Sequence, residues 1–322
     1  MRDAFAAALA AAARADDRVC LVLADLGVGV FDDFARAAPG RWFNAGIAEQ
    51  TMVGVAAGLA QSGKRAVAYS IAPFITSRAH DQIRVDVAAG AADVTLVGVG
   101  GGVAYGYLGL THHAIDDLAA MRALPNMTVL APCDPADAGR ATAAALALAG
   151  PVYLRLGKNG EPPLLDPGTR FEIGRAVRVR AGRHVTIAST GPILASALGA
   201  ADLLAREGVE AAVLHFGTVK PLDAEAVHDA LADTGLILAV EEHSITGGLG
   251  SALAEIAAET GAGRVLRAGF PDRFVHEVGG RAHLLSRYRL DADGVAERVR
   301  MAIGAGPRAG IFDPVTVSGG LR

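Results

Sequence analysis

The chain has 322 residues, which is long enough for two ordinary α/β domains that each bury a hydrophobic core. Hydrophobic residues make up 52% of it and charged residues 20%, which indicates a globular protein and excludes a disordered one. The formal net charge of −4 provides no basic surface for nucleic acid or anionic lipid, so neither a nucleic acid nor a membrane is an expected partner.

The predicted elements begin with an alanine-rich helix over Ala4–Arg14. The charged start, Met1-Arg2-Asp3, has neither the apolar core nor the cleavage pattern of a secretion signal. No window approaches the ~18 consecutive apolar residues of a membrane-spanning helix. A cytoplasmic protein is therefore expected.

Short β-branched runs then alternate with alanine-rich helical stretches, which is typical of a parallel sheet with helices on both faces. The predicted strands are Val19–Ala24, Ala66–Tyr69, Val94–Val99, Met127–Leu130 and Val152–Leu156. The further predicted helices are Ile47–Gln61, Phe74–Ala88 and Pro135–Ala149. Residues 1–160 are thus expected to form one doubly wound domain.

The pattern is lost after Leu156, where glycines and prolines leave no periodicity, so residues 161–183 are predicted to be a linker. A second α/β domain is expected over residues 184–306, and residues 307–322 form a tail. Its predicted elements are His184–Ser189, Leu194–Arg206, Glu210–His215, Ala224–Ala232, Leu236–Glu241, Gly248–Glu259, Val265–Ala268 and Asp293–Ile303. The fold class is therefore α/β, with two doubly wound domains.

Several familiar sites are excluded by their motifs. The glycine clusters at 98–102 and 247–250 lack the third glycine and the acidic residue of a dinucleotide fingerprint. No Walker-type phosphate loop and no Gly-x-Ser-x-Gly elbow occurs. Cys20 and Cys133 stand beside apolar residues without metal-ligand spacing, so buried reduced thiols and no metal site are predicted.

One glutamate stands in an unusual place. Glu49 opens a helix whose following turns contain mainly glycine and alanine, small residues that allow another backbone to approach closely. A carboxylate at the start of so apolar a helix is costly unless a partner meets it. It is either a group that stabilises the helix N-terminus or a carboxyl whose pKa is raised by burial, ready to exchange a proton with a bound heterocycle.

A second segment follows the predicted strand that ends at Tyr69. It reads Ser70-Ile-Ala-Pro-Phe74-Ile-Thr-Ser-Arg78-Ala-His-Asp-Gln82 and opens a helix. Ligands bind at such strand ends in open α/β sheets. Phe74 by itself is explained either as a core residue or as a platform for a flat ligand.

Taken together, these segments resemble the transketolase family. Gly46-Ile-Ala-Glu-Gln50, the Phe74–Gln82 segment and Thr111-His112-His113 are similar to its pyrimidine-binding domain, and Val240-Glu-Glu-His243…Gly247-Gly-Leu-Gly250 is similar to its C-terminal domain. The resemblance covers roughly residues 1–305 in the family's order. It implies a thiamine diphosphate-dependent enzyme that transfers a two-carbon ketol or acyl unit from a ketose or 2-oxo-acid donor to an aldehyde or ketone acceptor.

The resemblance also implies roles for individual residues. Glu49 would hydrogen-bond N1′ of the cofactor's aminopyrimidine and promote its activation, and Phe74 would stack on that ring. His112 would lie near the substrate's oxygens, as a catalytic and substrate-binding residue. Asp25 and Leu26 match an Asp-Leu pair close to the cofactor.

Other positions depart from the family's pattern. Ile71 replaces the first phenylalanine of the cofactor-binding segment, to which Arg78 also belongs. Tyr107 and Leu108 stand where an acidic pair that contacts substrate hydroxyls is usual. The positions expected to hold a substrate phosphate are also changed, namely Gly29 for serine, Gly100 for histidine and Lys158 for arginine. The hypothesis is an acceptor that is smaller, less polar or unphosphorylated.

The family's Gly-Asp-Gly…Asn motif, which binds the diphosphate and Mg²⁺, is missing from the sequence. The resemblance therefore implies a two-chain enzyme, an α2β2 heterotetramer in which an N-terminal-type subunit carries the diphosphate and Mg²⁺ site. Two alternatives remain open: the β subunit of a 2-oxo-acid dehydrogenase's decarboxylating component, and a non-catalytic regulatory subunit.

Overall fold

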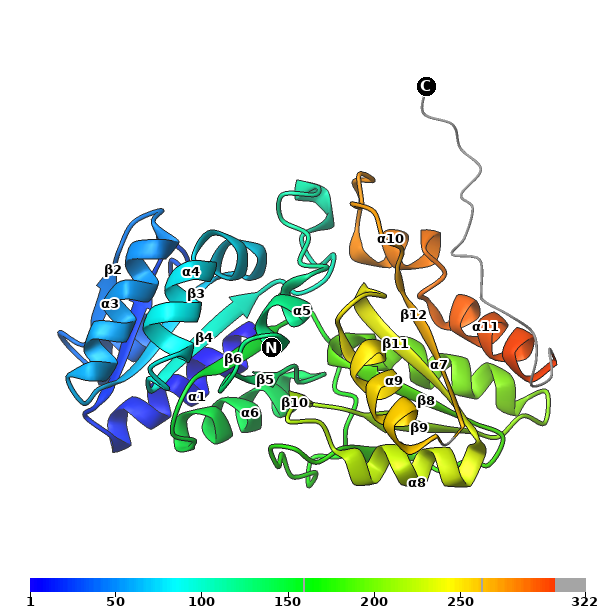
Figure 1. Cartoon of the computed structure of the whole chain (residues 1–322). Helices are drawn as coiled ribbons and strands as arrows, with labels where there is room; N and C mark the ends of the chain where they lie inside the picture. The colour runs from blue at the N-terminus through cyan, green and yellow to red at the C-terminus, as the bar shows by residue number, and fades with distance from the viewer. Residues whose placement is uncertain (159, 262, 305–322) are drawn as a thin grey trace.

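The computed structural model describes residues 1–158, 160–261 and 263–304, and within these it contains two α/β domains with largely parallel sheets (Figure 1). The predicted tail at 307–322 and the predicted domain end at 306 lie outside the described residues. No helix in the described part of the chain is long and apolar enough to span a bilayer.

The first sheet has the strand order β10-β5-β6-β4-β3-β1-β2. All its pairs are parallel except β10 with β5. Its inner strands are buried along nearly their whole length, as expected for a sheet covered on both faces. The strands of the first domain are β1 (Val19–Leu23), β2 (Trp42–Asn44), β3 (Arg65–Ile71), β4 (Val94–Val99), β5 (Thr128–Leu130) and β6 (Val152–Leu156).

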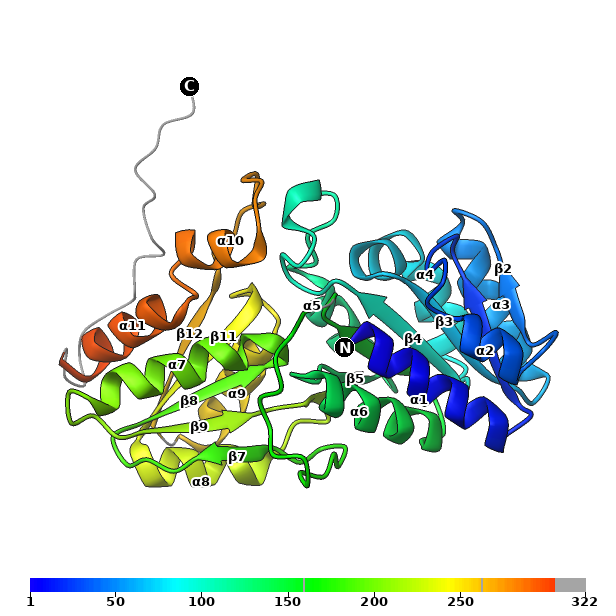
Figure 2. The same cartoon turned by 180° about the vertical axis from the view of Figure 1, so that it is seen from behind.

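Helices cover both faces of this sheet. One core cluster joins α1, α2 and α6 to it, and Figure 2 shows α1 and α6 in front of the strands. The opposite cluster contains α3, α5 and the segment after β3. The helices are α1 (Arg2–Ala15), α2 (Asp32–Ala37), α3 (Glu49–Gln61), α4 (His80–Gln82), α5 (Asp117–Arg122) and α6 (Pro135–Ala147).

The second sheet has the order β12-β11-β8-β9-β7, in which only β7 runs antiparallel. Its strands are β7 (Val177–Arg180), β8 (Val185–Thr190), β9 (Ala211–His215), β11 (Leu236–Ser244) and β12 (Arg264–Phe270). Its helices are α7 (Leu194–Ala205), α8 (Ala224–Thr234), α9 (Leu249–Thr260), α10 (Arg281–Arg287) and α11 (Ala292–Gly304). The second domain has two core clusters. One lies under α7, α10 and α11, and the other lies under α8 and α9.

Several features differ from the sequence-based expectation, which included no element at the positions of α2, β2, α5 and α10. The stretch expected to be a linker contains β7, which pairs with β9. The segment Thr218–Lys220 forms β10 and joins the first domain's sheet, because Val219 is buried in that domain's core. The single helix expected at Phe74–Ala88 is divided into the π-helical segments η1 (Phe74–Arg78) and η2 (Ile83–Ala88), with α4 between them.

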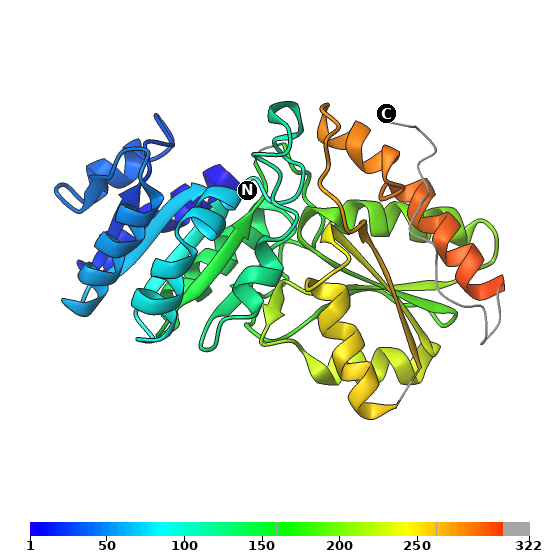
Figure 3. The same cartoon turned by 45° about the horizontal axis from the view of Figure 1, so that its top comes forward.

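The two domains are also joined by side chains. The Glu242 carboxylate, from β11, accepts a hydrogen bond from the Val103 amide at 2.9 Å and pairs with Arg281. The loop that follows β4 lies beside the segment before α10, where the Gly279 amide donates to the Gly106 carbonyl (Figure 3). The loops at the carboxyl end of the first sheet are therefore bounded on one side by the second domain.

Candidate functional site

Glu49 is the first residue of α3 and is buried, with 3% of its side chain exposed. The N-cap of that helix is Ala48, so Glu49 lies in the first helical turn. The Ser70 hydroxyl donates to Oε1 of the Glu49 carboxylate at 3.1 Å, and Arg78 Nη1 lies 3.2 Å from Oε2. The carboxylate therefore belongs to a polar cluster at the sheet edge and also lies where a negative charge stabilises the N-terminus of its helix.

Arg78 links that cluster to an aromatic ring. Its guanidinium carbon lies 3.9 Å from the centroid of Phe74, so the planar cation rests on the ring while it contacts Glu49. Both residues belong to η1, and π-helical turns of this kind occur frequently at functional sites. The Phe74 ring and the Glu49 carboxylate therefore contact the same flat, nitrogen-bearing group, the Arg78 guanidinium.

His112 completes the cluster from the loop after β4. Its ring centroid lies 4.9 Å from that of Phe74, and its Nδ1 lies 3.0 Å from the Thr111 hydroxyl. Burial, and then the positive charge of Arg78, lower the pKa of His112 below its ordinary value. The imidazole is therefore mainly neutral at pH 7 and can both donate and accept a hydrogen bond.

A cavity of about 270 Å³ opens beside these groups. It is lined by Phe74, Arg78, Thr111, His113, Asp116 and, from the second domain, Phe274. Sequence reasoning missed Ser70, Thr111 and Phe274. Ser70 and Thr111 adjoin predicted site residues, which was an available signal, whereas no local pattern connects Phe274 with the first domain.

Asp25, Leu26 and Gly29 lie elsewhere, in the loop after β1, where they line a separate cavity of about 240 Å³. Asp25 has a left-handed backbone with φ of 52°, and its carboxylate accepts a hydrogen bond from the Asn44 amide at 2.9 Å. These residues share the carboxyl edge of the sheet with Glu49. Within the described structure they line a different cavity from the one beside Phe74.

Gly100 and Lys158 both contact Tyr105. A Cβ built on Gly100 would overlap the Tyr105 ring, and the φ of +83° at this position is one that glycine adopts without strain. Lys158 Nζ lies 4.7 Å from the centroid of that ring. Glycine at position 100 therefore makes room for Tyr105, and Tyr105 in turn holds the lysine near the sheet edge.

The remaining predicted residues differ in exposure. Ile71 ends β3 and is buried in the core cluster beneath α1. Tyr107 and Leu108 lie on the short helical turn η3 (Gly106–Leu108) and are 77% and 55% exposed. Both side chains are therefore accessible to solvent, and neither lines the cavity beside Phe74.

The motif at 240–250 has a structural explanation. The Glu241 carboxylate accepts hydrogen bonds from the Leu249 and Gly250 amides at the start of α9, at 2.7 and 2.9 Å. Glu242 makes the contact between domains described above. The motif therefore determines how the second domain is built and attached, and its side chains do not line the cavity beside Phe74.

Comparison with known proteins decides between the families considered. The family described as "Transketolase, pyrimidine binding domain" matches residues 1–162, and "Transketolase, C-terminal domain" matches residues 174–295. The chain belongs to the transketolase family. Membership implies dependence on thiamine diphosphate, and the matches do not favour the 2-oxo-acid dehydrogenase alternative.

Similar transketolases are themselves two-chain enzymes. The chain is 36% identical over 299 residues to one subunit of the apulose-4-phosphate transketolase of Phocaeicola vulgatus, covering 92% of this chain and 95% of that one. It is 38% identical over 293 residues to "6-deoxy-6-sulfo-D-fructose transketolase subunit SqwH" of a Clostridium species, covering 91% of each. A solved structure described as "Split gene transketolase, inactive beta4 tetramer" is 39% identical, with a TM-score of 0.85, and covers 94% of this chain and 97% of that one. The chain is thus the counterpart of one subunit of these split transketolases.

Proposed function

We propose that this chain is the cofactor-activating half of a two-chain transketolase, and that Glu49 is its activating acid. The observation that carries the proposal is the pairing of Arg78 with both Phe74 and Glu49. A flat group stacks on the phenyl ring while its N–H points at the carboxylate. An aminopyrimidine ring has the same shape and the same hydrogen-bonding edge, so the residues fit the cofactor.

The roles of the side chains follow from this fit. Bound thiamine diphosphate supplies the nucleophilic carbon that takes up and passes on the two-carbon unit. Glu49 shares a proton with N1′ of the aminopyrimidine, and the Ser70 hydroxyl holds the carboxylate in place. Phe74 supports the ring, and Arg78 vacates the place that it occupies in the chain alone. His112 donates a hydrogen bond to a substrate oxygen as a neutral imidazole.

The partner would supply the diphosphate and Mg²⁺ site in an α2β2 heterotetramer. The exposed face of α3 supports an interface there, because a Cβ at Gly54 or Gly58 would meet no atom within 4 Å. Ile47, just before that helix, is 78% exposed. A similar protein, described as an inactive β4 tetramer of a split-gene transketolase, also supports the need for a second type of subunit.

The substrate would be less polar at one end than a standard sugar phosphate. Tyr107, Leu108, Leu110 and Phe274 present exposed apolar surface around the site. One ammonium group, on Lys158, remains near the sheet edge, and it meets an anion as a point charge without the bidentate geometry of arginine. Both features favour a small or deoxygenated acceptor.

Glu49→Gln in the complex reconstituted with a diphosphate-binding subunit tests the first proposal. The amide keeps the shape of the side chain but cannot exchange the proton, so kcat for two-carbon transfer should fall about 10²- to 10⁴-fold. Glu210→Gln, the same change at an exposed ion pair, is the control. Unchanged activity in Glu49→Gln would establish the regulatory alternative instead.

Leu108→Asp tests the proposed substrate. A carboxylate at position 108 should raise kcat/KM for polyhydroxylated acceptors by about 10- to 150-fold, since a hydrogen bond to a charged group contributes about 1.5–3 kcal/mol. Met301→Asp, the same type of change at an exposed apolar residue on α11, is the control. If the unaltered complex converts xylulose 5-phosphate and ribose 5-phosphate with ordinary transketolase efficiency, the proposed substrate preference is wrong.

A further inference from the structure

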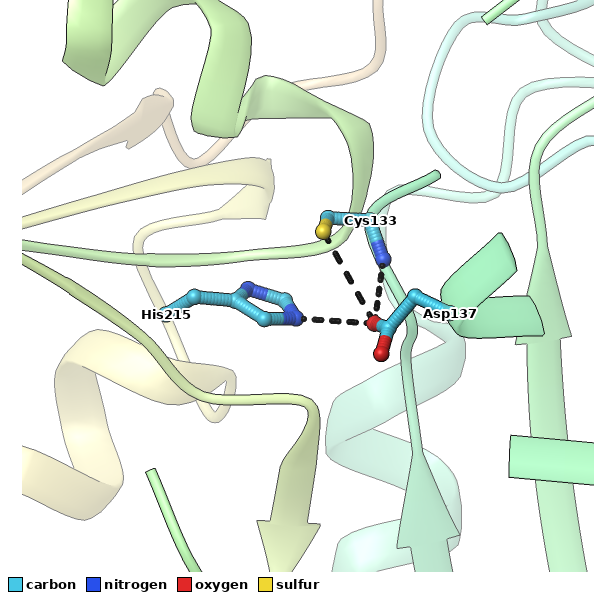
Figure 4. Close-up of side chains that lie close together, drawn as sticks. All are labelled: Cys133, Asp137 and His215. Carbon is cyan, nitrogen blue, oxygen red and sulfur yellow. Dashed lines mark hydrogen bonds and ion pairs between the residues drawn. The ribbon is translucent and has the colours of Figure 1, made fainter. Parts of the chain in front are cut away.

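A buried cluster of chemically reactive side chains lies between the two domains, away from the cavity described above. It consists of Cys133, just before α6, Asp137, in the first turn of α6, and His215, at the end of β9 (Figure 4). All three residues are at most 1% exposed. Within the part of the chain that the structure describes, no other group of this kind occurs.

Two of the distances in the cluster are close to those of a coordination polyhedron, and the three ligand atoms all lie within 4.8 Å of one another. Asp137 Oδ2 lies 3.2 Å from His215 Nε2 and 3.7 Å from Cys133 Sγ, and Figure 4 shows both side chains directed at this oxygen. Tetrahedral zinc, with bonds of about 2.0 Å to nitrogen or oxygen and about 2.3 Å to sulfur, separates its ligands by about 3.3 Å (N–O) and about 3.5 Å (S–O). The cluster can therefore close on a metal ion with only small side-chain movements.

Two buried polar atoms without hydrogen-bond partners also favour a metal site. His215 Nδ1 and the Ser189 hydroxyl are both buried without a hydrogen-bond partner among the described residues. Ser189 is paired with His215 in the register of β8 and β9, so the two side chains lie on the same face of neighbouring strands. A histidine that binds a metal through one nitrogen usually donates from the other to a neighbouring oxygen, and we infer that the Ser189 hydroxyl takes this role once a metal is bound.

The charges are also suitable. A thiolate and a carboxylate together neutralise a divalent cation, and a neutral imidazole adds no charge. Arg140 approaches the other oxygen of the carboxylate, with its Nη2 at 3.6 Å from Oδ1, whereas Oδ2 faces the cluster and also accepts a hydrogen bond from the Cys133 amide at 3.1 Å. Soft thiolate and imidazole ligands select zinc-like metals over Mg²⁺, which prefers oxygen.

We propose that Cys133, Asp137 and His215 form a structural binding site for a zinc-like divalent metal that clamps the two domains together. Binding releases the thiol proton to solvent, and a water molecule takes the fourth position. The site is independent of the proposed cofactor function. Because its ligands come from both domains, the metal stabilises their mutual position as well as each fold.

Cobalt(II) is the probe, because a cobalt–thiolate bond gives a near-ultraviolet charge-transfer band that Mg²⁺ sites and histidine-only sites lack. The full chain is refolded with Co²⁺, since the cluster is closed to solvent. One equivalent should bind, with that band and tetrahedral visible bands, and Zn²⁺ should abolish both. The melting temperature should rise with the metal bound.

Cys133→Ala should remove the charge-transfer band, whereas Cys20→Ala, at the only other cysteine, should keep it. His215→Asn retains a hydrogen-bonding group toward Asp137 and should weaken cobalt binding at least tenfold, which covers the case in which Cys133→Ala does not fold. A missing band in the unaltered chain, or a band that survives Cys133→Ala, overturns the proposal.

Discussion

The buried pair Arg155–Asp117 provides a quantitative test of how the first domain is held together. Asp117 is fully buried at the start of α5 and lies 2.9 Å from Arg155 Nε. The Tyr153 hydroxyl donates to the same carboxylate at 2.7 Å. Arg155 Nη2 donates in turn to the carbonyls of Ala114 and Glu242, so the pair also reaches the second domain. We predict that Asp117→Ala is among the more destabilising single changes in this chain.

The magnitude follows from burial. Arg155 is only 4% exposed, and alanine at position 117 leaves its charge without a counter-ion in a region closed to water. Breaking one side of a buried pair costs about 3–5 kcal/mol. At about 2–4 °C per kcal/mol for a domain of this size, the first thermal transition should fall by about 6–20 °C.

Thermal unfolding followed by circular dichroism measures the effect. Asp233→Ala is the matched control, because that residue forms an exposed pair with Arg178 at 3.2 Å, and exposed pairs contribute about 1 kcal/mol or less. Equal losses in the two variants would refute the reasoning, since burial would then have no bearing on the energy of the pair.

Two further outcomes follow from the candidate site. Phe74→Ala in the reconstituted complex should weaken thiamine diphosphate binding about 2- to 12-fold, because about 0.5–1.5 kcal/mol of stacking is lost. Calorimetric titration measures this affinity, and an unchanged affinity would contradict a stacking role. His112 should titrate below its ordinary value of 6.5, because burial and Arg78 disfavour its charged form. Its folded-state pKa is lowered, so its contribution to stability is complete above about pH 6.5 and falls as the pH drops from there toward the folded pKa. Proton NMR, with the resonance assigned through His112→Asn, checks this, and a pKa at or above 6.5 would contradict it.

The sequence alone determined most of the fold and the family. Hydrophobic periodicity placed all five predicted strands of the first domain within a few residues of their observed positions, because buried parallel strands are continuous β-branched runs. Glu49 was recognisable because a carboxylate before so many alanines and glycines contradicts the local pattern. The roles of Glu49 and the other site residues stay predictions.

Short elements that depend on distant partners could not be predicted. The strand β10 has only Thr218–Lys220 to signal it, and what makes it a strand is an open edge on β5, in the other domain. The strand β7 lies in a stretch without periodicity and is stabilised by β9. In both cases the hydrogen-bonding partner is far along the chain, so no local window contains the information.

Contacts between distant parts of the chain also limited what could be predicted about the two candidate sites. Motif resemblance pointed to Glu49, Phe74, Arg78 and His112, but only folding places the Arg78 guanidinium between the phenyl ring and the carboxylate. Sequence spacing gave no hint of the buried cluster, since 78 positions separate Asp137 from His215. Packing of one domain on the other brings these side chains within hydrogen-bond distance and removes them from water. Proximity and burial together are the conditions on which the proposed metal site depends.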